Sequence, residues 1–374
     1  MLRADRISTR GKTLLQCMLF SAALVGCTEE PQPVAETAKD CGGKDCGDAG
    51  HGKFECVNHR CELKCSEGFG RCADDTACET PLQTSRDHCG ACDKDCSEGY
   101  CQEGKCVEPK VQAKDLAGVE SVSQLGDELR LIKAGTHFER ASYVRLSNGE
   151  LEPVERTRIM PGAYADGTFF GCESPLEGDT CQLSRESADH KQSTKITKLD
   201  RVQLQSMAVD GESLYVGVEL GDDDPSGVMR ILQVSLPSGN VTKVYDVRGP
   251  LGGMAAYQGN VFWCESHQLK VLRVGSREPA LLATKCGDLQ THEGFVYFMD
   301  ASALFRVPLQ GGPVEWVLTL RSDLHAAGFR ILDDRIYYGA GGTEVRRPFV
   351  LREIRVPPKA RLTSHQNPAS PPVK

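Results

Sequence analysis

Cysteine is the residue type whose number and spacing in this sequence most clearly imply chemistry. The chain of 374 residues has 18 cysteines, and 12 of them lie within 41–106. So many thiols either bind metal or oxidise to disulfides outside the reducing cytosol. A structural zinc site takes two closely spaced pairs such as CxxC. Only Cys89 and Cys92, next to His88, have that spacing, so disulfides are favoured and zinc is the alternative.

The first 26 residues have the composition of a signal peptide rather than of a folded element. Four basic residues precede an apolar run at 14–26. This run of 13 residues is shorter than the ~20 apolar residues that a membrane-spanning helix needs. We therefore predict that residues 1–26 are a signal peptide, which is removed after export.

The end of this segment carries a more specific signal. The tetrapeptide Leu24-Val25-Gly26-Cys27 resembles the lipobox of bacterial lipoproteins. The resemblance implies that Cys27 receives a diacylglyceryl group and becomes the new N-terminus, so that lipid holds the protein to the membrane. Thr28, in place of an aspartate, favours the outer membrane, on its periplasmic or surface face. The alternative is an ordinary secretory signal in which the cysteine is coincidental.

The charge of the mature chain limits the choice of partners. Removal of residues 1–26 leaves 40 Lys+Arg against 51 Asp+Glu, a net charge of −11. Nucleic-acid binding needs a basic surface, so no nucleic-acid partner is expected. Electrostatic attachment to anionic lipid is disfavoured for the same reason. Residues 27–40 are polar, acidic and Pro-containing, which predicts a lipidated flexible tether.

Residues 41–108 are predicted to form a small disulfide-rich module, because the segment has few large apolar residues and needs covalent crosslinks. Without the two cysteines of the signal peptide and the lipobox, 16 remain, an even number. Connectivity in the module is left open, with neighbouring pairs such as Cys101–Cys106 considered. The candidate disulfide cysteines are Cys41, Cys46, Cys56, Cys61, Cys65, Cys72, Cys78, Cys89, Cys92, Cys96, Cys101, Cys106, Cys172, Cys181, Cys264 and Cys286.

The spacing of the later cysteines in this module is also informative. Residues 78–106 follow the pattern CET…CGxC…C…C…GxC. This resembles a cysteine-rich repeat found in secreted and surface proteins of some Gram-negative bacteria. The resemblance implies an extracytoplasmic disulfide module, and no chemistry comes with it.

Residues 115–357 contain a repeated unit, in which a turn residue and two spacers precede an aromatic residue within a β-prone run. Successive units are 35 to 47 residues apart, which suits one four-stranded antiparallel sheet each. The aromatic side chains are predicted to pack between neighbouring sheets, and no long amphipathic helix is expected. The anchor positions are Arg130, Phe170, Tyr215, Phe262, Tyr297 and Tyr337, of which only the first is not aromatic.

Three segments of these units, 261–265, 296–300 and 304–313, resemble six-bladed β-propellers of the YWTD and TolB-like type. The resemblance implies a mainly β fold with a six-bladed propeller over 115–357, and seven blades is the alternative. Residues 358–374 are Pro-rich and polar and are predicted to be disordered.

The blade topology predicts the pairing of the last four cysteines. Cys172 and Cys181 flank a turn, so a bridge between them would clamp a hairpin. Cys264 lies near the end of the second strand of one blade, and Cys286 opens the first strand of the next. These two ends meet on one face of an up-and-down blade arrangement, so a bridge there would tie two blades together.

The linear motifs of catalysis are missing, since the sequence has no G-x-S-x-G, P-loop, G-x-G-x-x-G or HExxH. The acidic loop at 221–227 could attract calcium, but it lacks the EF-hand spacing. Asn260 is considered as an axial metal neighbour, with a turn role preferred. We therefore assign no catalytic, cofactor-binding or metal residues.

The sequence favours a non-enzymatic, lipid-anchored envelope protein whose propeller binds a protein or glycan. The alternative is a membrane-tethered propeller hydrolase or lactonase with an axial metal, and a third possibility is a structural subunit of an envelope assembly. Carboxylates on the propeller axis would favour the enzyme, whereas small or apolar residues there would favour binding.

Overall fold

A computed structural model shows how the chain folds. The residues that it describes are 41, 46–47, 49–72, 75–116, 119–125, 128–133, 142–147, 150–153, 160–173, 180–187, 191–220, 228–300, 303–320, 325–341 and 349–357. The predicted signal peptide, the predicted tether with Cys27, the acidic segment 221–227 and the predicted disordered segment 358–374 lie outside these residues. In the part that is described, no helix has the length and apolar character needed to cross a membrane.

The chain divides into two compact units, one of residues 1–47 and 54–62 and the other of residues 48–53 and 63–374. Short hairpins make up the cysteine-rich segment, and few of them bury much apolar surface. These hairpins are β1 (Gly52–Val57) with β2 (Arg60–Cys65), β3 (Phe69–Gly70) with β4 (Thr80–Pro81), and β5 (Tyr100–Gln102) with β6 (Lys105–Val107).

Six disulfides hold the cysteine-rich segment together, which confirms the predicted disulfide-rich module. They are Cys41–Cys56, Cys46–Cys61, Cys65–Cys78, Cys72–Cys92, Cys89–Cys101 and Cys96–Cys106. The considered pairing of Cys101 with Cys106 is wrong. These two residues lie opposite each other across β5 and β6, so both side chains project from one face of the hairpin. Each reaches a sulfur atom of the 89–96 segment instead of the other.

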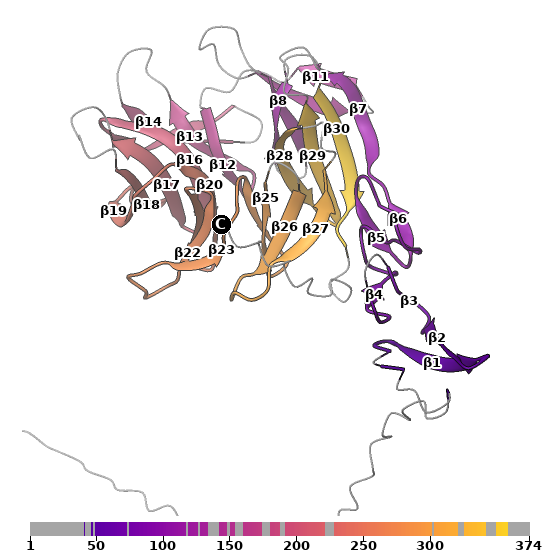
Figure 1. Cartoon of the computed structure of the whole chain (residues 1–374). Helices are drawn as coiled ribbons and strands as arrows, with labels where there is room; N and C mark the ends of the chain where they lie inside the picture. Colours follow the sequence, from indigo (N-terminus) through magenta and orange to yellow (C-terminus); the bar gives the residue numbers. More distant parts are fainter. Residues whose placement is uncertain are drawn as a thin grey trace, which may run out of the picture. The chain divides into compact units, whose positions relative to one another are not determined.

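The larger unit contains six four-stranded antiparallel sheets (Figure 1). The first has β8 (Val119–Leu125), β9 (Glu128–Lys133), β10 (Ser142–Ser147) and β11 (Glu150–Pro153), and the second has β12 (Met160–Ala165), β13 (Thr168–Glu173), β14 (Cys181–Ser187) and β15 (Ser193–Leu199). The third has β16 (Val202–Asp210), β17 (Ser213–Leu220), β18 (Met229–Ser235) and β19 (Val241–Val247). The fourth has β20 (Leu251–Tyr257), β21 (Asn260–Glu265), β22 (Gln268–Leu272) and β23 (Ala280–Ala283). The fifth has β24 (Leu289–His292), β25 (Phe295–Met299), β26 (Ala303–Pro308) and β27 (Glu315–Thr319).

The sixth sheet joins the first and last strands of the propeller. It contains β28 (His325–Leu332), β29 (Arg335–Gly341) and β30 (Phe349–Arg355). Its fourth strand is β7 (Lys110–Leu116), which precedes the other propeller strands in the sequence. The sequence analysis did not find β7, because its residues are mostly polar and show no aromatic anchor. The other five sheets use four consecutive strands each.

The sheets are arranged as in a β-propeller. The first strands of successive sheets contact one another in order, β12 with β16, β16 with β20, β20 with β24, β24 with β28, and β28 with β8. Each of the six anchor positions lies in the second strand of its sheet, as the repeat predicts. The prediction of a mainly β propeller after a disulfide-rich module is therefore confirmed. A seventh four-stranded sheet does not occur among the described residues.

The core of the propeller lies between neighbouring sheets. Tyr215 of the third sheet packs with Trp263 of the fourth, and Phe262 of the fourth packs with Phe298 of the fifth. Tyr297 of the fifth sheet lies in one cluster with residues of the sixth. The anchor aromatics thus bind the sheets to one another, which is their predicted role.

Two disulfides reinforce this arrangement, with the pairing that the blade topology predicts. Cys172, in β13, is bonded to Cys181, the first residue of β14. Cys264, in β21, is bonded to Cys286, which precedes β24 in the next sheet. The second bridge therefore links the fourth sheet to the fifth.

The last disulfide loop of the module contacts the propeller directly. Gly99 exchanges two backbone hydrogen bonds with Thr319 of β27, at 3.2 and 3.1 Å. Glu98 accepts a hydrogen bond from Tyr338 Oη at 2.8 Å and forms an ion pair with Arg352. Tyr100 is buried in the cluster that joins the fifth and sixth sheets. The end of the module is thus part of the propeller core.

Candidate functional site

A cavity of about 300 Å³ lies among the first strands of the propeller sheets. Six strands contribute to its described lining, and five of them are first strands of their sheets. The first strands bring Tyr164 (β12), Met207 (β16), Met254 (β20), Gln290 (β24) and Arg330 (β28), and β13 brings Phe169. Each of the first strands is at one edge of its sheet, so its outer backbone N–H and C=O groups have no ladder partner. The cavity therefore offers backbone donors and acceptors beside its side chains.

Small residues let the sheets approach closely around the cavity. Ala208, Ala255 and Ala256 belong to its lining, together with Gly253. A Cβ atom on Gly253 would lie 2.7 Å from the carbonyl oxygen of Gly287, so only glycine fits there. The wall formed by β16 and β20 is thus mainly small and apolar.

The charged side chains of the described lining lie on the opposite wall, between β24 and β28. Arg330 Nη1 donates to Asp288 Oδ2 at 2.6 Å. Asp288 also accepts from the backbone N–H of Phe329 at 3.2 Å and of Leu289 at 3.0 Å. The Arg330 and Asp288 side chains are 26% and 30% exposed, so both remain accessible from the cavity.

Gln290 fastens the same two strands together. Its Nε2 donates to the carbonyl of Ile331 at 3.0 Å, and its Oε1 accepts from the N–H of Ile331 at 2.8 Å. The side-chain amide therefore replaces a backbone partner between β24 and β28. It serves the packing of the two sheets, and Arg330 is the one cationic side chain of the described lining.

Few side chains of the described lining could bind a metal ion. Among the described lining residues, Asp288 is the single carboxylate, and it is already paired with a cation. Asn260, considered as an axial ligand, has a turn role instead. Its Nδ2 donates to the Tyr257 carbonyl at 3.2 Å, and its Oδ1 accepts from the Val274 N–H at 3.2 Å.

The sequence analysis did not single out Asp288 or Arg330. They are 42 residues apart and belong to no linear motif. The repeat does not align them either. Arg330 pairs with the anchor Tyr337, whereas the residue that pairs with the anchor Tyr297 is Gln290, and Asp288 precedes β24.

Three other acids lie at the end of a second strand, where the repeat has an aromatic-x-x-acid pattern. They are Glu173, Glu265 and Asp300. Glu173 accepts hydrogen bonds from Ser184 and Ser193 of its own sheet, at 3.0 and 3.3 Å. Asp300 accepts from the N–H of Ala303 at 3.0 Å. These acids therefore stabilise the blades.

Glu265 is held by three donors at the end of β21. Trp263 Nε1 donates at 3.2 Å, Lys270 Nζ lies at 2.9 Å, and the Arg248 N–H donates at 3.2 Å. Burial alone would raise the pKa of Glu265, but the hydrogen bonds from Lys270, Trp263 and Arg248 outweigh it and lower the pKa. The carboxylate is therefore the favoured form in the folded protein.

We expect the free energy of unfolding to fall less between neutral and acidic pH in Glu265→Gln than in the wild type. Because its folded pKa lies below the unfolded value of about 4.3, the ionised group stabilises the fold above that value. This contribution is lost as pH falls through the folded pKa. Denaturant unfolding at neutral and acidic pH measures the effect, with the exposed Glu278→Gln as the control. Equal pH dependence in wild type and Glu265→Gln would contradict the expectation.

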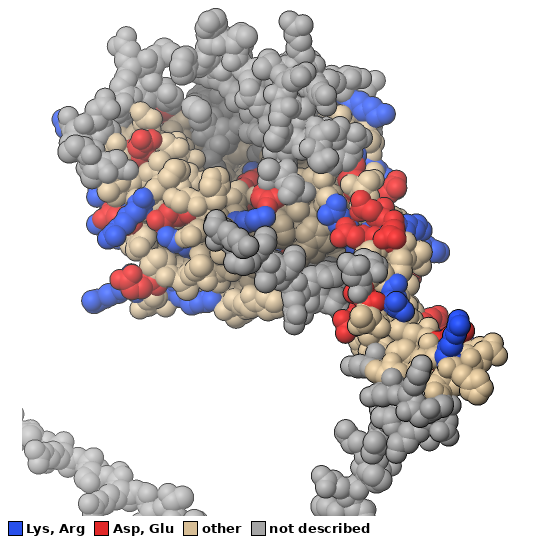
Figure 2. All heavy atoms as spheres, in the orientation of Figure 1, with Lys and Arg blue, Asp and Glu red and all other residues tan. Residues whose placement is uncertain are grey.

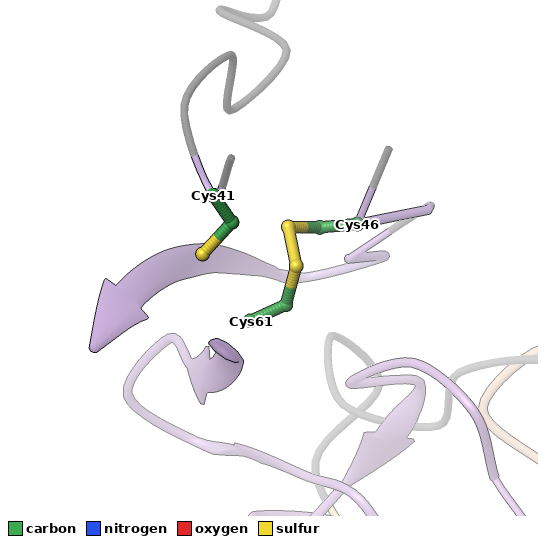
Figure 3. A group of neighbouring side chains, drawn as sticks. All are labelled: Cys41, Cys46 and Cys61. Atoms are coloured by element: carbon green, nitrogen blue, oxygen red, sulfur yellow. A yellow bond between two sulfur atoms is a disulfide. The ribbon is translucent and has the colours of Figure 1, made fainter. Parts of the chain in front are cut away.

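Two groups of three cysteine sulfurs lie close enough to resemble a metal site. One is Cys41, Cys46 and Cys61, and the other is Cys89, Cys96 and Cys106. Figure 3 shows that Cys46 and Cys61 are bonded to each other. All six residues are in disulfides, and zinc requires thiolates. The close sulfurs thus reflect neighbouring disulfides.

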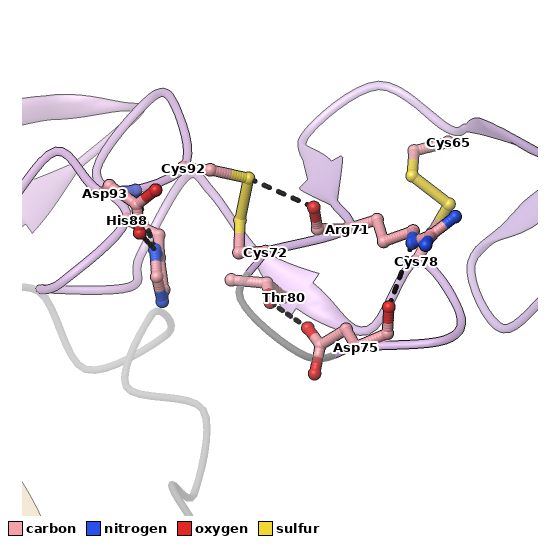
Figure 4. Close-up of a disulfide and its surroundings, with 9 residues drawn as sticks. All are labelled: Cys65, Arg71, Cys72, Asp75, Cys78, Thr80, His88, Cys92 and Asp93. Carbon is pink, nitrogen blue, oxygen red and sulfur yellow. Dashed lines mark hydrogen bonds and ion pairs between the residues drawn. A yellow bond between two sulfur atoms is a disulfide. The ribbon is translucent and has the colours of Figure 1, made fainter.

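The CxxC pair of the zinc alternative is divided between two disulfides. Cys92 is bonded to Cys72 (Figure 4), and Cys89 is bonded to Cys101. The adjacent His88 faces Asp93, whose backbone N–H donates to His88 Nδ1 at 2.9 Å. This histidine therefore stabilises a turn, and the group does not have the ligands of a zinc site.

Comparisons with known proteins find similarity to solved structures alone. No protein-family model and no curated protein matches this sequence. A chain of a nidogen–laminin complex has 14% identity and a TM-score of 0.39, over 54% of this chain and 76% of that chain. A calcium-binding regucalcin from Agrobacterium tumefaciens has 12% identity and a TM-score of 0.48, over 67% and 95%. An oligogalacturonate lyase from Vibrio parahaemolyticus has 10% identity and a TM-score of 0.40, over 69% and 95%. The propeller assignment rests on the sheets themselves.

Proposed function

We propose that this protein is a non-enzymatic binding protein of the bacterial cell envelope, anchored by lipid at Cys27 and using its propeller for recognition. The lining of the axial cavity carries the proposal. Its described residues are small or apolar on one wall, and the Asp288–Arg330 pair lies on the other. A concave site in which a few polar side chains converge is the usual form of a ligand-binding site.

The disulfides support the cellular location. All 16 cysteines after Cys27 form disulfides, and such proteins occur outside the reducing cytosol. The charged surface supports a protein or glycan partner, because Figure 2 shows Lys and Arg intermixed with Asp and Glu on the face that it draws. We infer that the outer membrane holds the lipid.

We further infer that the six sheets are the six blades of one propeller. Pairing of β7 with β30 supports this inference, because it joins the first and last strands of the propeller within one sheet. Closure of this kind removes the sheet edges that would otherwise pair with other chains. It also means that β7, the first strand of the propeller, pairs only with β30, the last strand.

A single set of experiments tests the proposed function in the native host. Mass spectrometry of the mature protein should find a diacylglyceryl group on an N-terminal Cys27, and Cys27→Ala should release the protein from membranes. Crosslinking in intact cells should capture an envelope protein or glycan. The purified protein should show no turnover of ester or lactone substrates with added calcium, manganese or zinc. Turnover that is lost on chelation would instead support the hydrolase alternative.

A further inference from the structure

We propose that the axial cavity binds a small molecule with a carboxylate group, and that Arg330 is the residue that recognises it. This inference rests on the proposed binding function and names the ligand class for the cavity. Three observations carry it, namely the hydrogen bonds of the guanidinium, the position of Asp288, and the size and walls of the cavity.

The guanidinium of Arg330 is only partly used by the protein. Of its nitrogen atoms, Nη1 alone has protein partners among the described residues, the Asp288 carboxylate and the Phe329 carbonyl. The N–H groups of Nε and Nη2 therefore remain for another acceptor. Arginine presents its donors as a planar fork that matches the two oxygens of a carboxylate. One edge of the guanidinium is thus fixed by the fold while the other edge is open.

Asp288 holds the arginine in place rather than competing for its open edge. Two backbone N–H groups, of Leu289 and Phe329, fix the carboxylate at 3.0 and 3.2 Å. Gly328, the residue that precedes Phe329, has φ +97°, and a Cβ there would lie 3.2 Å from Asp288 Oδ2. The carboxylate therefore has little freedom to move. Its negative charge keeps Arg330 near the cavity wall, but it also weakens the attraction of a second anion.

The size and walls of the cavity limit the rest of the ligand. A volume of about 300 Å³ is at the lower end for ligand pockets and suits a small molecule. Met207 and Met254 also belong to the lining, but both side chains are buried between the sheets, so the accessible surface of the cavity is more polar than apolar. Gln290 is fully engaged with Ile331. The described groups therefore suit a small carboxylate that fits this volume and reaches the open edge of Arg330.

Calorimetric titration of two variants with opposite expected effects tests the proposal. The probes are butyrate and benzoate, with butylammonium and butanol as the cationic and neutral counterparts. Arg330→Gln should lower the affinity for the carboxylates by about 10-fold or more, as expected for a lost charged hydrogen bond. Asp288→Asn should raise it, because it removes a neighbouring negative charge while keeping the shape of the side chain. Butylammonium and butanol should show neither response.

Controls separate binding from loss of the fold. Arg277→Gln removes an exposed arginine and should leave carboxylate binding as in wild type. Arg330→Lys keeps the charge but loses the fork, and it should bind the carboxylates with intermediate affinity. Near-ultraviolet circular dichroism establishes that each variant is folded.

Several results would overturn the proposal. One is that neither carboxylate binds to the wild type, and another is that Arg330→Gln and the wild type bind the carboxylates with equal affinity. A third is that Asp288→Asn loses binding while Arg330→Gln gains it, which would indicate a cationic ligand. Each of these leaves the lipid anchor and the envelope partner untouched. Failure of the proposed function would appear instead as ester or lactone turnover.

Discussion

Replacement of Glu98 by alanine is expected to lower the free energy of unfolding by about 3–5 kcal/mol, because it leaves a buried cation without its partner. Glu98 is 7% exposed and forms an ion pair with Arg352, whose side chain is 11% exposed. It also accepts the Tyr338 hydroxyl at 2.8 Å. Burial and the nearby Glu98 carboxylate raise the pKa of Tyr338, so the phenol stays protonated as a donor. One substitution thus leaves two buried polar groups unpaired.

The effect extends across two parts of the chain. Glu98 belongs to the last disulfide loop, whereas Tyr338 and Arg352 belong to β29 and β30 of the closing sheet. We therefore expect faster backbone hydrogen exchange in β7 and β30 of the variant, in addition to its lower stability. Denaturant unfolding with all disulfides intact measures the free energy.

A matched control distinguishes the ion pair from the hydrogen bond. Tyr338→Phe removes only the hydroxyl group and is expected to cost about 1 kcal/mol. If Glu98→Ala proved no more harmful than Tyr338→Phe, the ion pair with Arg352 would contribute little. The end of the module would then be held mainly by Tyr100 and by the backbone bonds between Gly99 and Thr319.

Trp263→Ala is expected to cost about 3–5 kcal/mol, the range for loss of a large buried aromatic residue. Trp263 is fully buried in the core cluster between the third and fourth sheets. Its ring lies 5.5 Å from that of Tyr245, and its Nε1 donates to Glu265 at 3.2 Å. The substitution therefore opens a cavity between two sheets and removes one of the donors that stabilise the Glu265 carboxylate.

The measurement is again denaturant unfolding, with Tyr257→Ala as the control in the same sheet. Tyr257 is 40% exposed, so its truncation should change the free energy of unfolding by much less. Calorimetry should show a lower melting temperature for Trp263→Ala. Similar losses for the two variants would mean that the interface between the third and fourth sheets contributes little to stability.

Much of the fold could be predicted because the signals are local and repeated. The spacing of Phe170, Tyr215, Phe262 and Tyr297 placed each in a second strand, since every unit buries its aromatic against the next sheet. The pairing of Cys264 with Cys286 followed from the same alternation of strands. These features could be predicted from the direction of each strand and the order of the repeated units alone.

The candidate site was less predictable, because its parts come from separate units. Asp288 and Arg330 become neighbours only when β24 and β28 lie side by side. The six pairings in the module were equally unpredictable, since each depends on which loop covers a given hairpin. The Cys101–Cys106 pairing failed for this reason, although the two residues are cross-strand neighbours.

The amino-acid sequence by itself determined the repeated four-stranded units. It also determined the need for disulfides in a segment with few apolar side chains to bury. Both follow from residue types at short spacing. The tertiary structure alone decided that β7 completes the last sheet, that Glu98 joins the module to the propeller core, and that Arg330 opens into an axial cavity. Each of these depends on contacts between residues more than 40 positions apart. Such contacts form only when separate sheets pack side by side, and no local pattern encodes which residues then meet.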